Sequence, residues 1–293
     1  MGIILVVPPQ VYIERLNNAE YSGSNLDFWS SHAFRGIYPE GNFSWHHLWF
    51  LPYLLAFSLA LTPLFLYFRN NPDNQFLNWI KEQVKAPVGF LWFLLPLYLA
   101  QILLKPYFPE THAFVGDWYT LVNYSLLFFY GFVLITIKEI FWKIVLDNIR
   151  IFLLSGMVFF SVYLLLVLRS TDIFLADYLI PLIVDINSWS WILALFGFAA
   201  RYLNKKSTAL SYANETVYPF YILHQTVIIC LGYSLKDFDF GFWQKADFMV
   251  AGTFITSWIL YEFLIRRIGF LRPLFGLKTE ESKSTKAGVV AEV

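Results

Sequence analysis

The stretch that decides the fold is residues 151–168, which reads IFLLSGMVFFSVYLLLVL and contains no charged side chain. A helix needs about 20 mostly apolar residues to cross a hydrocarbon core about 30 Å thick. Two weaker stretches of this kind are 188–203, which can start as early as Tyr178, and 248–265, which contains Glu262. Four more stretches lack Asp, Glu, Lys and Arg altogether: 45–68, 86–104, 118–137 and 216–235. We therefore predict an all-α, polytopic transmembrane helical bundle with about seven complete spans.

The composition agrees with a membrane protein and excludes other classes. Of the 293 residues, 58% are hydrophobic and 14% are charged, against about 25% charged residues in a soluble domain. The 21 Lys and Arg balance the 21 Asp and Glu, so no net field attracts nucleic acid, and we expect no nucleic-acid partner. One cysteine, Cys230, excludes an internal disulfide and a Cys-rich metal site, and we predict no metal centre.

The basic residues predict the orientation in the membrane. Lys and Arg accumulate in cytoplasmic loops, and 15 of the 21 lie in alternate connecting segments that include the C-terminal one. The C-terminus is therefore predicted to be cytoplasmic, and the loop 14–44 to lie outside. The expected location is the inner membrane of a bacterium, in contact with its lipids.

The beginning of the chain departs from this pattern. Residues 1–13 read MGIILVVPPQVYI, an apolar stretch too short to cross the bilayer. It has neither the basic region nor the small-residue cleavage site of a secretory signal. We interpret it as the outer half of a span, an N-terminal half-span, and expect the chain to be truncated at its N-terminus.

Two amphipathic stretches and a polar tail complete the predicted organisation. Apolar residues at i, i+4 and i+8 (Phe76, Ile80 and Val84) and a second stripe over 140–145 predict two helices in the membrane interface. The segment 279–293 is polar and predicted to be disordered. We expect residues 1–278 to form a single transmembrane domain.

His224 is the most prominent candidate for chemistry. It lies about ten residues into the stretch 216–235, near the middle of the membrane at about 1.5 Å per residue. Tyr218, Tyr221 and Gln225 share a helix face with His224 at its flank. An ionisable side chain at this depth indicates a functional site. A neutral histidine bonded to a neighbouring helix is the alternative.

The second candidate is His47, which with His46 lies among aromatic residues at the outer end of a predicted span. Interfacial anchoring explains Trp45 and Trp49, but explains adjacent histidines less well. Glu262 and Arg266, at i and i+4, favour a structural ion pair. Outer-loop residues His32, Arg35 and His112 are weaker candidates, with Arg35 a possible contact for substrate.

Four segments together carry a family resemblance. They are WHHLWFLPYL (45–54), RYLNKKS (201–207), YPFYILHQTV (218–227) and LRPLFGLK (271–278). In this order they resemble the integral-membrane acyltransferase family called acyltransferase type 3, nearest to its glucan-modifying succinyltransferases, the branch that includes glucan biosynthesis protein C. The resemblance extends over essentially the whole chain.

The resemblance implies transfer of an acyl group from cytoplasmic acyl-CoA, a co-substrate rather than a bound cofactor, to a hydroxyl of a carbohydrate or envelope glycan. It also implies a catalytic histidine in a first span that residues 1–44 do not contain, so we expect little activity from this chain alone. His47 and His224 remain the catalytic candidates. We expect Trp49, Tyr218 and Tyr221 to orient the acceptor, and Arg201, Lys205 and Lys206 to meet the CoA phosphates.

Two other function classes remain open. Aromatic-lined spans with a mid-membrane histidine and a Pro-kinked helix also suit a transporter or carrier. A catalytically inactive membrane scaffold is the third possibility. Covalent transfer of a labelled acyl group to a glycan separates an enzyme from both. The sequence does not identify protein partners.

Overall fold

The structure is a computed structural model that describes residues 1–168 and 176–278. Within these residues the regular secondary structure is helical, with an isolated bridge between Ile37 and Phe43. The predicted all-α fold is confirmed. The predicted disordered tail, 279–293, lies outside the described residues.

The chain forms two compact units. Unit 1 combines Met1–Leu48 with the chain from Lys206 onward, and unit 2 comprises Trp49–Lys205. The expectation of a single domain over residues 1–278 stays a prediction.

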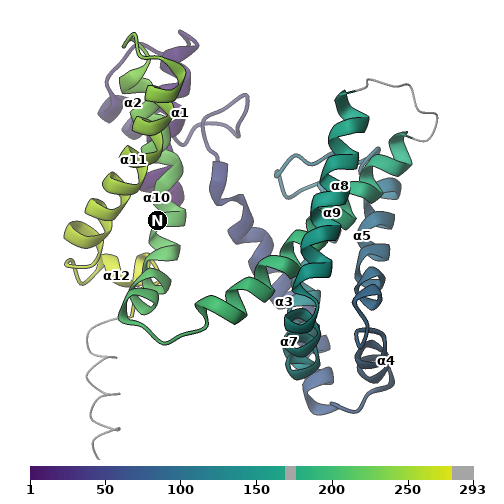
Figure 1. Cartoon of the computed structure of the whole chain (residues 1–293). Coiled ribbons are helices and arrows are strands. Elements are labelled where there is room, and N and C mark those ends of the chain that lie inside the picture. Colours follow the sequence, from purple (N-terminus) through teal and green to yellow (C-terminus); the bar gives the residue numbers. More distant parts are fainter. Residues whose placement is uncertain (169–175, 279–293) are drawn as a thin grey trace, which may run out of the picture. The chain divides into compact units, whose positions relative to one another are not determined.

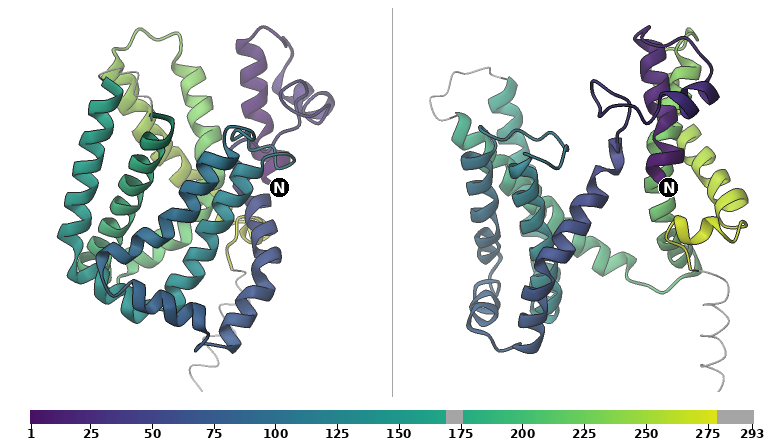
Figure 2. Two further views of the ribbon diagram at one scale, coloured as in Figure 1. Left: turned by 90° about the vertical axis from the view of Figure 1, so that its right-hand side faces the viewer. Right: turned by 180° about the vertical axis from the view of Figure 1, so that it is seen from behind.

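Unit 2 contains most of the long apolar helices. The helices of unit 2 are α3 (Phe50–Asn70), α4 (Gln75–Gln83), α5 (Leu91–Leu104), α6 (Trp118–Thr136), α7 (Lys138–Asp147), α8 (Ile149–Leu168) and α9 (Ala176–Phe198). Helical turns η3 (Pro87–Phe90) and η4 (Ala199–Leu203) precede α5 and extend α9. Helices α8 and α9 run side by side (Figure 1, Figure 2). A Cβ atom at Gly156 would lie 3.1 Å from the indole of Trp191, so a small residue allows this close packing.

An aromatic core joins α5, α6 and α9 within unit 2. The Phe93 ring meets Tyr130 edge to face, with 4.9 Å between ring centroids, and stacks on Trp189 at 5.8 Å. All three side chains are buried. These ring contacts hold α5, α6 and α9 together by close van der Waals packing. Such packing is needed because burial of apolar surface alone does not drive helices to associate in lipid.

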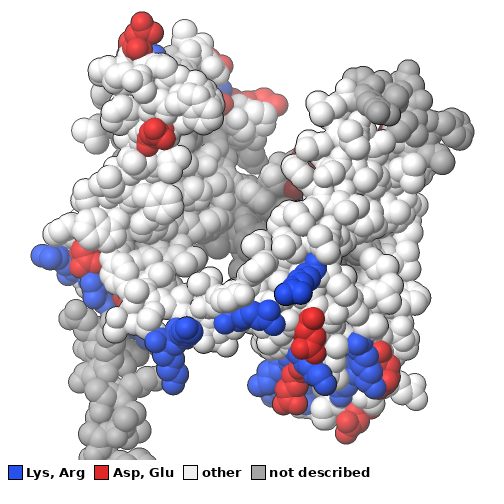
Figure 3. Space-filling view, viewed as in Figure 1, with Lys and Arg blue, Asp and Glu red and all other residues white. Residues whose placement is uncertain are grey.

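The two amphipathic stretches form α4 and α7, as predicted. Helix α4 buries Leu77 and Ile80, and α7 buries Phe141 and Val145. The charged side chains of unit 2 gather at the end where α4 and α7 lie (Figure 3). This distribution is typical of helices at a membrane–water interface.

Unit 1 is built on the long helix α10. Its elements are η1 (Gly2–Val6), α1 (Pro8–Asn17), α2 (Asn25–Ser31), α10 (Thr208–Leu235), α11 (Phe242–Ile259), η5 (Leu260–Ile265) and α12 (Leu271–Leu274), with η2 (His46–Trp49) at the boundary to unit 2. Helix α10 contacts both α1 and α11 (Figure 1). A Cβ atom at Gly252 would lie 3.0 Å from Leu231, so α10 and α11 approach closely at this level.

The N-terminal segment is helical beyond the predicted half-span. Residues 2–6 form η1, and α1 continues to Asn17 through the Pro8-Pro9 pair. The two prolines occupy the first positions of α1, where a missing backbone N–H costs nothing.

Six helices among the described residues are long and apolar enough to cross a membrane. They are His46–Asn70, Pro87–Leu104, Trp118–Thr136, Ile149–Leu168, Ala176–Leu203 and Phe242–Ile265. The fifth begins at Ala176, which agrees with the early start near Tyr178 that was predicted for the stretch 188–203. Helix α10 was predicted as a further span but is not among the six, because Tyr218, His224 and Gln225 lower its hydropathy.

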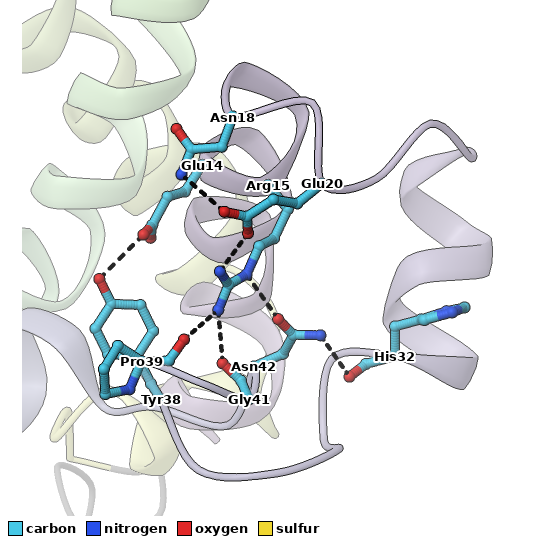
Figure 4. Close-up of polar contacts among 9 residues, drawn as sticks. All are labelled: Glu14, Arg15, Asn18, Glu20, His32, Tyr38, Pro39, Gly41 and Asn42. Carbon is cyan, nitrogen blue, oxygen red and sulfur yellow. Dashed lines mark hydrogen bonds and ion pairs between the residues drawn. The ribbon is translucent and has the colours of Figure 1, made fainter.

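The loop between α2 and η2 is fastened to α1 through Arg15. Its guanidinium donates to Asn42 Oδ1 at 2.9 Å, to the Pro39 carbonyl at 2.6 Å and to the Gly41 carbonyl at 2.8 Å, and pairs with Glu20 (Figure 4). Gly41 lies against Gly36, whose carbonyl carbon would be 2.1 Å from a Cβ atom at position 41. Only glycine allows this crossing of the loop.

Candidate active site around His47 and His224

The two histidines predicted as catalytic lie together in unit 1. The ring centroids of His47 and His224 are 5.4 Å apart, with an interplanar angle of 83°. His47 belongs to η2, and His224 to the middle of α10. The ring of Tyr221 lies 6.0 Å from His47 and 6.1 Å from His224, so the three form one aromatic cluster.

Backbone and side-chain contacts fix the position of η2 on α10. Nε2 of His47 lies 2.9 Å from the carbonyl oxygen of Ile222, and the Tyr221 hydroxyl donates to the carbonyl of His47 at 2.7 Å. Before the turn, the Ser44 hydroxyl oxygen accepts from the backbone N–H of His46 at 3.0 Å. The hydrogen bonds to α10 place His47 against the turn that precedes His224.

These contacts define the tautomer of His47. A carbonyl oxygen only accepts, so Nε2 of His47 carries the proton that it shares with Ile222. Nδ1 is then the acceptor, and Nε2 of Gln10 lies 3.4 Å away to donate to it. Both nitrogens of His47 are therefore engaged in this neutral form.

Gln10 is a site residue that the sequence analysis missed. Its side chain is buried, and Nε2 also donates to Thr226 Oγ1 at 2.6 Å and approaches the Val6 carbonyl at 3.3 Å. The contact with the Val6 carbonyl identifies this end of the amide as nitrogen, because two acceptors would repel each other. Thr226 in turn donates to the carbonyl of Val6 at 2.7 Å. A glutamine inside the apolar stretch 1–13 was the signal that could have identified it.

His224 is held differently. Its Nδ1 donates to the carbonyls of Tyr221 and Phe220, at 2.8 and 3.1 Å, within its own helix. Nε2 is then the lone-pair nitrogen. No hydrogen bond engages this atom within the described part of the chain.

His224 lies on the wall of a cavity of about 470 Å³ between α10 and α11. Tyr221 also lines this cavity, and the other lining side chains are mostly aliphatic or aromatic. An imidazole at the wall of a mostly apolar cavity, with one nitrogen bonded within its own helix, is an arrangement suited to a general base.

The other predicted substrate contacts have the following surroundings. Tyr218 is next to the cluster, with its ring 6.4 Å from Tyr221. Trp49 belongs to unit 2, where it stacks on His112 at 3.8 Å. Arg35 is exposed in the loop after α2.

The three basic residues predicted for CoA lie where α9 ends and the chain continues to α10. Arg201, in η4, donates to the carbonyl of Leu146 at 3.2 Å. It lines a small pocket of about 270 Å³ in unit 2 together with Arg150 and Asp147. Lys205 and Lys206 follow with exposed side chains. Arg201, Lys205 and Lys206 lie close together in the sequence, which suits contact with an anion. In the pocket, Arg150 provides a second guanidinium beside that of Arg201.

A separate polar cluster in unit 2 surrounds Asp117. Its carboxylate accepts from Thr120 at 2.6 Å, and from the Tyr53 hydroxyl and the His112 backbone N–H, both at 2.7 Å. Burial alone would raise the pKa of Asp117, but these hydrogen bonds outweigh it and hold the pKa below its ordinary value. Since the contacts tie the loop 111–117 to α3 and α6, we assign the cluster a structural role.

Comparison with known proteins supplies the family. The family model described as Acyltransferase domain matches residues 3–262. Searches of curated proteins and of solved structures give no match. The matched region includes every element of unit 2 and the whole His47–His224 cluster. Together with the helices able to cross a membrane, this match shows that the chain is an integral membrane protein belonging to the Acyltransferase domain family.

Proposed function

We propose that this protein moves an acyl group from acyl-CoA to a hydroxyl of a carbohydrate or envelope glycan, as the resemblance to glucan-modifying enzymes implies. The observation that carries this proposal is that His224 lines the cavity with its Nδ1 bonded within α10, which leaves Nε2 without a hydrogen-bond partner among the described residues. A fixed neutral imidazole is what acylation of a hydroxyl requires.

The proposed reaction uses His224 as the general base. Nε2 takes the proton of the acceptor hydroxyl as its oxygen bonds to the thioester carbonyl carbon. The carbon–sulfur bond then breaks, and the imidazolium returns the proton to the CoA thiolate. Protons and electrons balance without a further reactant.

His47 has a supporting role in this proposal. Both of its nitrogens are engaged, by Ile222 and Gln10, so it holds the turn of α10 in front of His224 rather than taking a proton in this geometry. Tyr221, bonded to the His47 carbonyl, belongs to the same support. Tyr218 and Tyr221 offer ring faces on which an acceptor sugar can lie.

The donor is proposed to be bound through its phosphates. Arg201, Lys205 and Lys206 supply three cations on the segment between α9 and α10, and guanidinium groups bind phosphate in a bidentate manner. The distribution of Lys and Arg supports a cytoplasmic position for this segment and for the C-terminus, in a bacterial inner membrane.

The test is acyl transfer by membranes that contain the protein. Radiolabelled acyl-CoA is added together with an envelope glycan fraction, and ester-linked label on the glycan is counted. His224→Ala is expected to lower the rate at least about 100-fold, since general base catalysis contributes 10²–10⁴-fold. His32→Ala is the matched control, because this outer-loop histidine stacks on Phe28 away from the cluster. Equal rates for wild type and His224→Ala, at equal abundance, would refute the proposal.

A further inference from the structure

The cavity between α10 and α11 has one continuous wall on each helix. Helix α10 contributes residues spaced as one helix face, Val217, Phe220, Tyr221, His224 and Ile228, and α11 contributes Met249, Val250, Thr253 and Phe254. From Val217 to Ile228 the wall runs about 16 Å at 1.5 Å per residue. The volume of about 470 Å³ is within the 300–1,000 Å³ typical of small-molecule sites.

The polar atoms of this wall are almost all committed to other partners. The Tyr221 hydroxyl donates to the carbonyl of His47, and the Thr253 hydroxyl donates to the carbonyl of Met249 at 2.6 Å. Nδ1 of His224 donates to carbonyls of its own helix. The side-chain polar atoms that the described wall can still offer to a ligand are therefore acceptors: Nε2 of His224 and the oxygens of these two hydroxyls.

The wall also selects against charge. The described lining residues include no Lys, Arg, Asp or Glu. A carboxylate placed here would lose its hydration without a cation to compensate, which disfavours its binding. A succinyl group, with its terminal carboxylate, does not match this wall.

An aliphatic chain does match it. The rings of Phe220 and Phe254, which both line the cavity, lie in a tilted contact with 6.2 Å between centroids and 47° between their planes. Val250 and Met249 extend the apolar surface along α11. A ligand with an apolar body matches this surface, and the hydroxyl that it acylates can donate to Nε2 of His224.

We propose that the cavity between α10 and α11 takes the uncharged aliphatic chain of the acyl donor, with the thioester carbonyl beside His224. This inference rests on the proposed function and specifies its substrate class, a fatty acyl thioester rather than a dicarboxylic one. It leaves the acceptor as proposed above.

The test is photolabelling, which reads occupancy without requiring turnover. Membranes containing the protein are irradiated with a dodecanoyl-CoA that carries a diazirine near the end of its chain, and the labelled peptides are mapped. We expect label on α10 and α11, removed by excess dodecanoyl-CoA and retained in excess succinyl-CoA. Equal competition by succinyl-CoA would overturn the inference. Label that neither thioester removes would also overturn it, since it would mean that membrane lipid fills the cavity.

Two variants on α11 make the test specific. Thr253→Phe fills the cavity and is expected to reduce labelling about tenfold. Ile255→Phe adds the same ring at a position 57% exposed and outside the lining, so its labelling should equal that of the wild type. Equal labelling of the two variants would overturn the inference.

A third variant separates this inference from the proposed function. His224→Asn is expected to retain the label and lose acyl transfer. Retained label in a wild-type protein that transfers no acyl group would refute the proposed function alone. Wild-type transfer that is faster with succinyl-CoA than with dodecanoyl-CoA would refute the chain site alone.

Discussion

Nε2 of Gln10 lies 3.4 Å from Nδ1 of His47, and it joins two residues that are 37 positions apart in the sequence. The same amide donates to Thr226 on α10 at 2.6 Å. Gln10 thus connects α1, η2 and α10 at a buried point. In the proposed enzyme it selects the tautomer of His47 and through it the position of the turn before His224.

Replacing Gln10 should therefore impair acyl transfer without removing a reacting group. Gln10→Leu leaves Nδ1 of His47 without a donor, and a shift of the turn before His224 is expected to lower kcat roughly 10- to 100-fold. KM for acyl-CoA should stay unchanged. A fall in kcat without a change in KM distinguishes a role in positioning the catalytic histidine from a role in binding the substrate.

Two controls accompany this prediction. Thr226→Val removes the hydroxyl that orients Gln10 and should give a smaller loss of the same kind. Gln225→Leu changes a neighbouring glutamine for which the described structure shows no side-chain hydrogen bond, and it should leave kcat unchanged. A loss in Gln225→Leu equal to that in Gln10→Leu would mean that both act through folding.

The Arg15 contacts predict a second effect, on the outer loop. Arg15→Met removes the donors to Asn42, Pro39 and Gly41, so the loop that carries Arg35 should open. Trypsin cleavage after Arg35 in detergent-solubilised protein is expected to become several times faster. Lys236→Met is the control, because it removes one positive charge at a residue that lies 4.1 Å above the ring of Tyr233 and makes none of the Arg15 contacts. Unchanged cleavage in Arg15→Met would mean that the close contact between Gly36 and Gly41 holds the loop without the Arg15 hydrogen bonds.

The proposed orientation gives a third prediction. In a Cys230→Ser background, Tyr107→Cys lies in a loop proposed to be outside, at a position 78% exposed. A membrane-impermeant maleimide should label it on intact cells. Lys85→Cys, next to α4 on the proposed cytoplasmic side, should react only after the membrane is opened. The reverse labelling pattern would place the C-terminus outside.

The helices were largely predictable because apolar runs and the absence of charge are local properties of a sequence. The stretch 151–168 is α8 with two more residues at its start, and Phe76, Ile80 and Val84 correctly identified α4. Helix α10 was predicted to be a span from its uncharged stretch 216–235, yet its polar side chains make it less apolar than the six helices able to cross a membrane.

The candidate site was predictable only in part. His47 and His224 were identified by residue type and depth, but their proximity depends on how η2 lies against α10, which no local pattern encodes. Gln10 was missed for the same reason, since its partners Thr226 and His47 are distant in sequence. Trp49 was expected to orient the acceptor, which stays a prediction, and the structure shows it stacked on His112.

Asp117 provides the last prediction, on stability against pH. Its pKa is lowered in the folded protein, so its contribution is fully present above the ordinary carboxyl pKa of about 4 and is lost as pH falls through the lower, folded value. Thermal unfolding in detergent should therefore show a stability loss below about pH 4.

Asp117→Asn places an amide nitrogen opposite the donors Tyr53, Thr120 or the His112 N–H. It should lower stability at pH 7 by about 1–3 kcal/mol and show a weaker loss on acidification. Asp147→Asn, a change at the end of α7 with the same charge difference, controls for net charge. An equal pH dependence in wild type and Asp117→Asn would show that the carboxylate is not the group whose protonation weakens this end of unit 2.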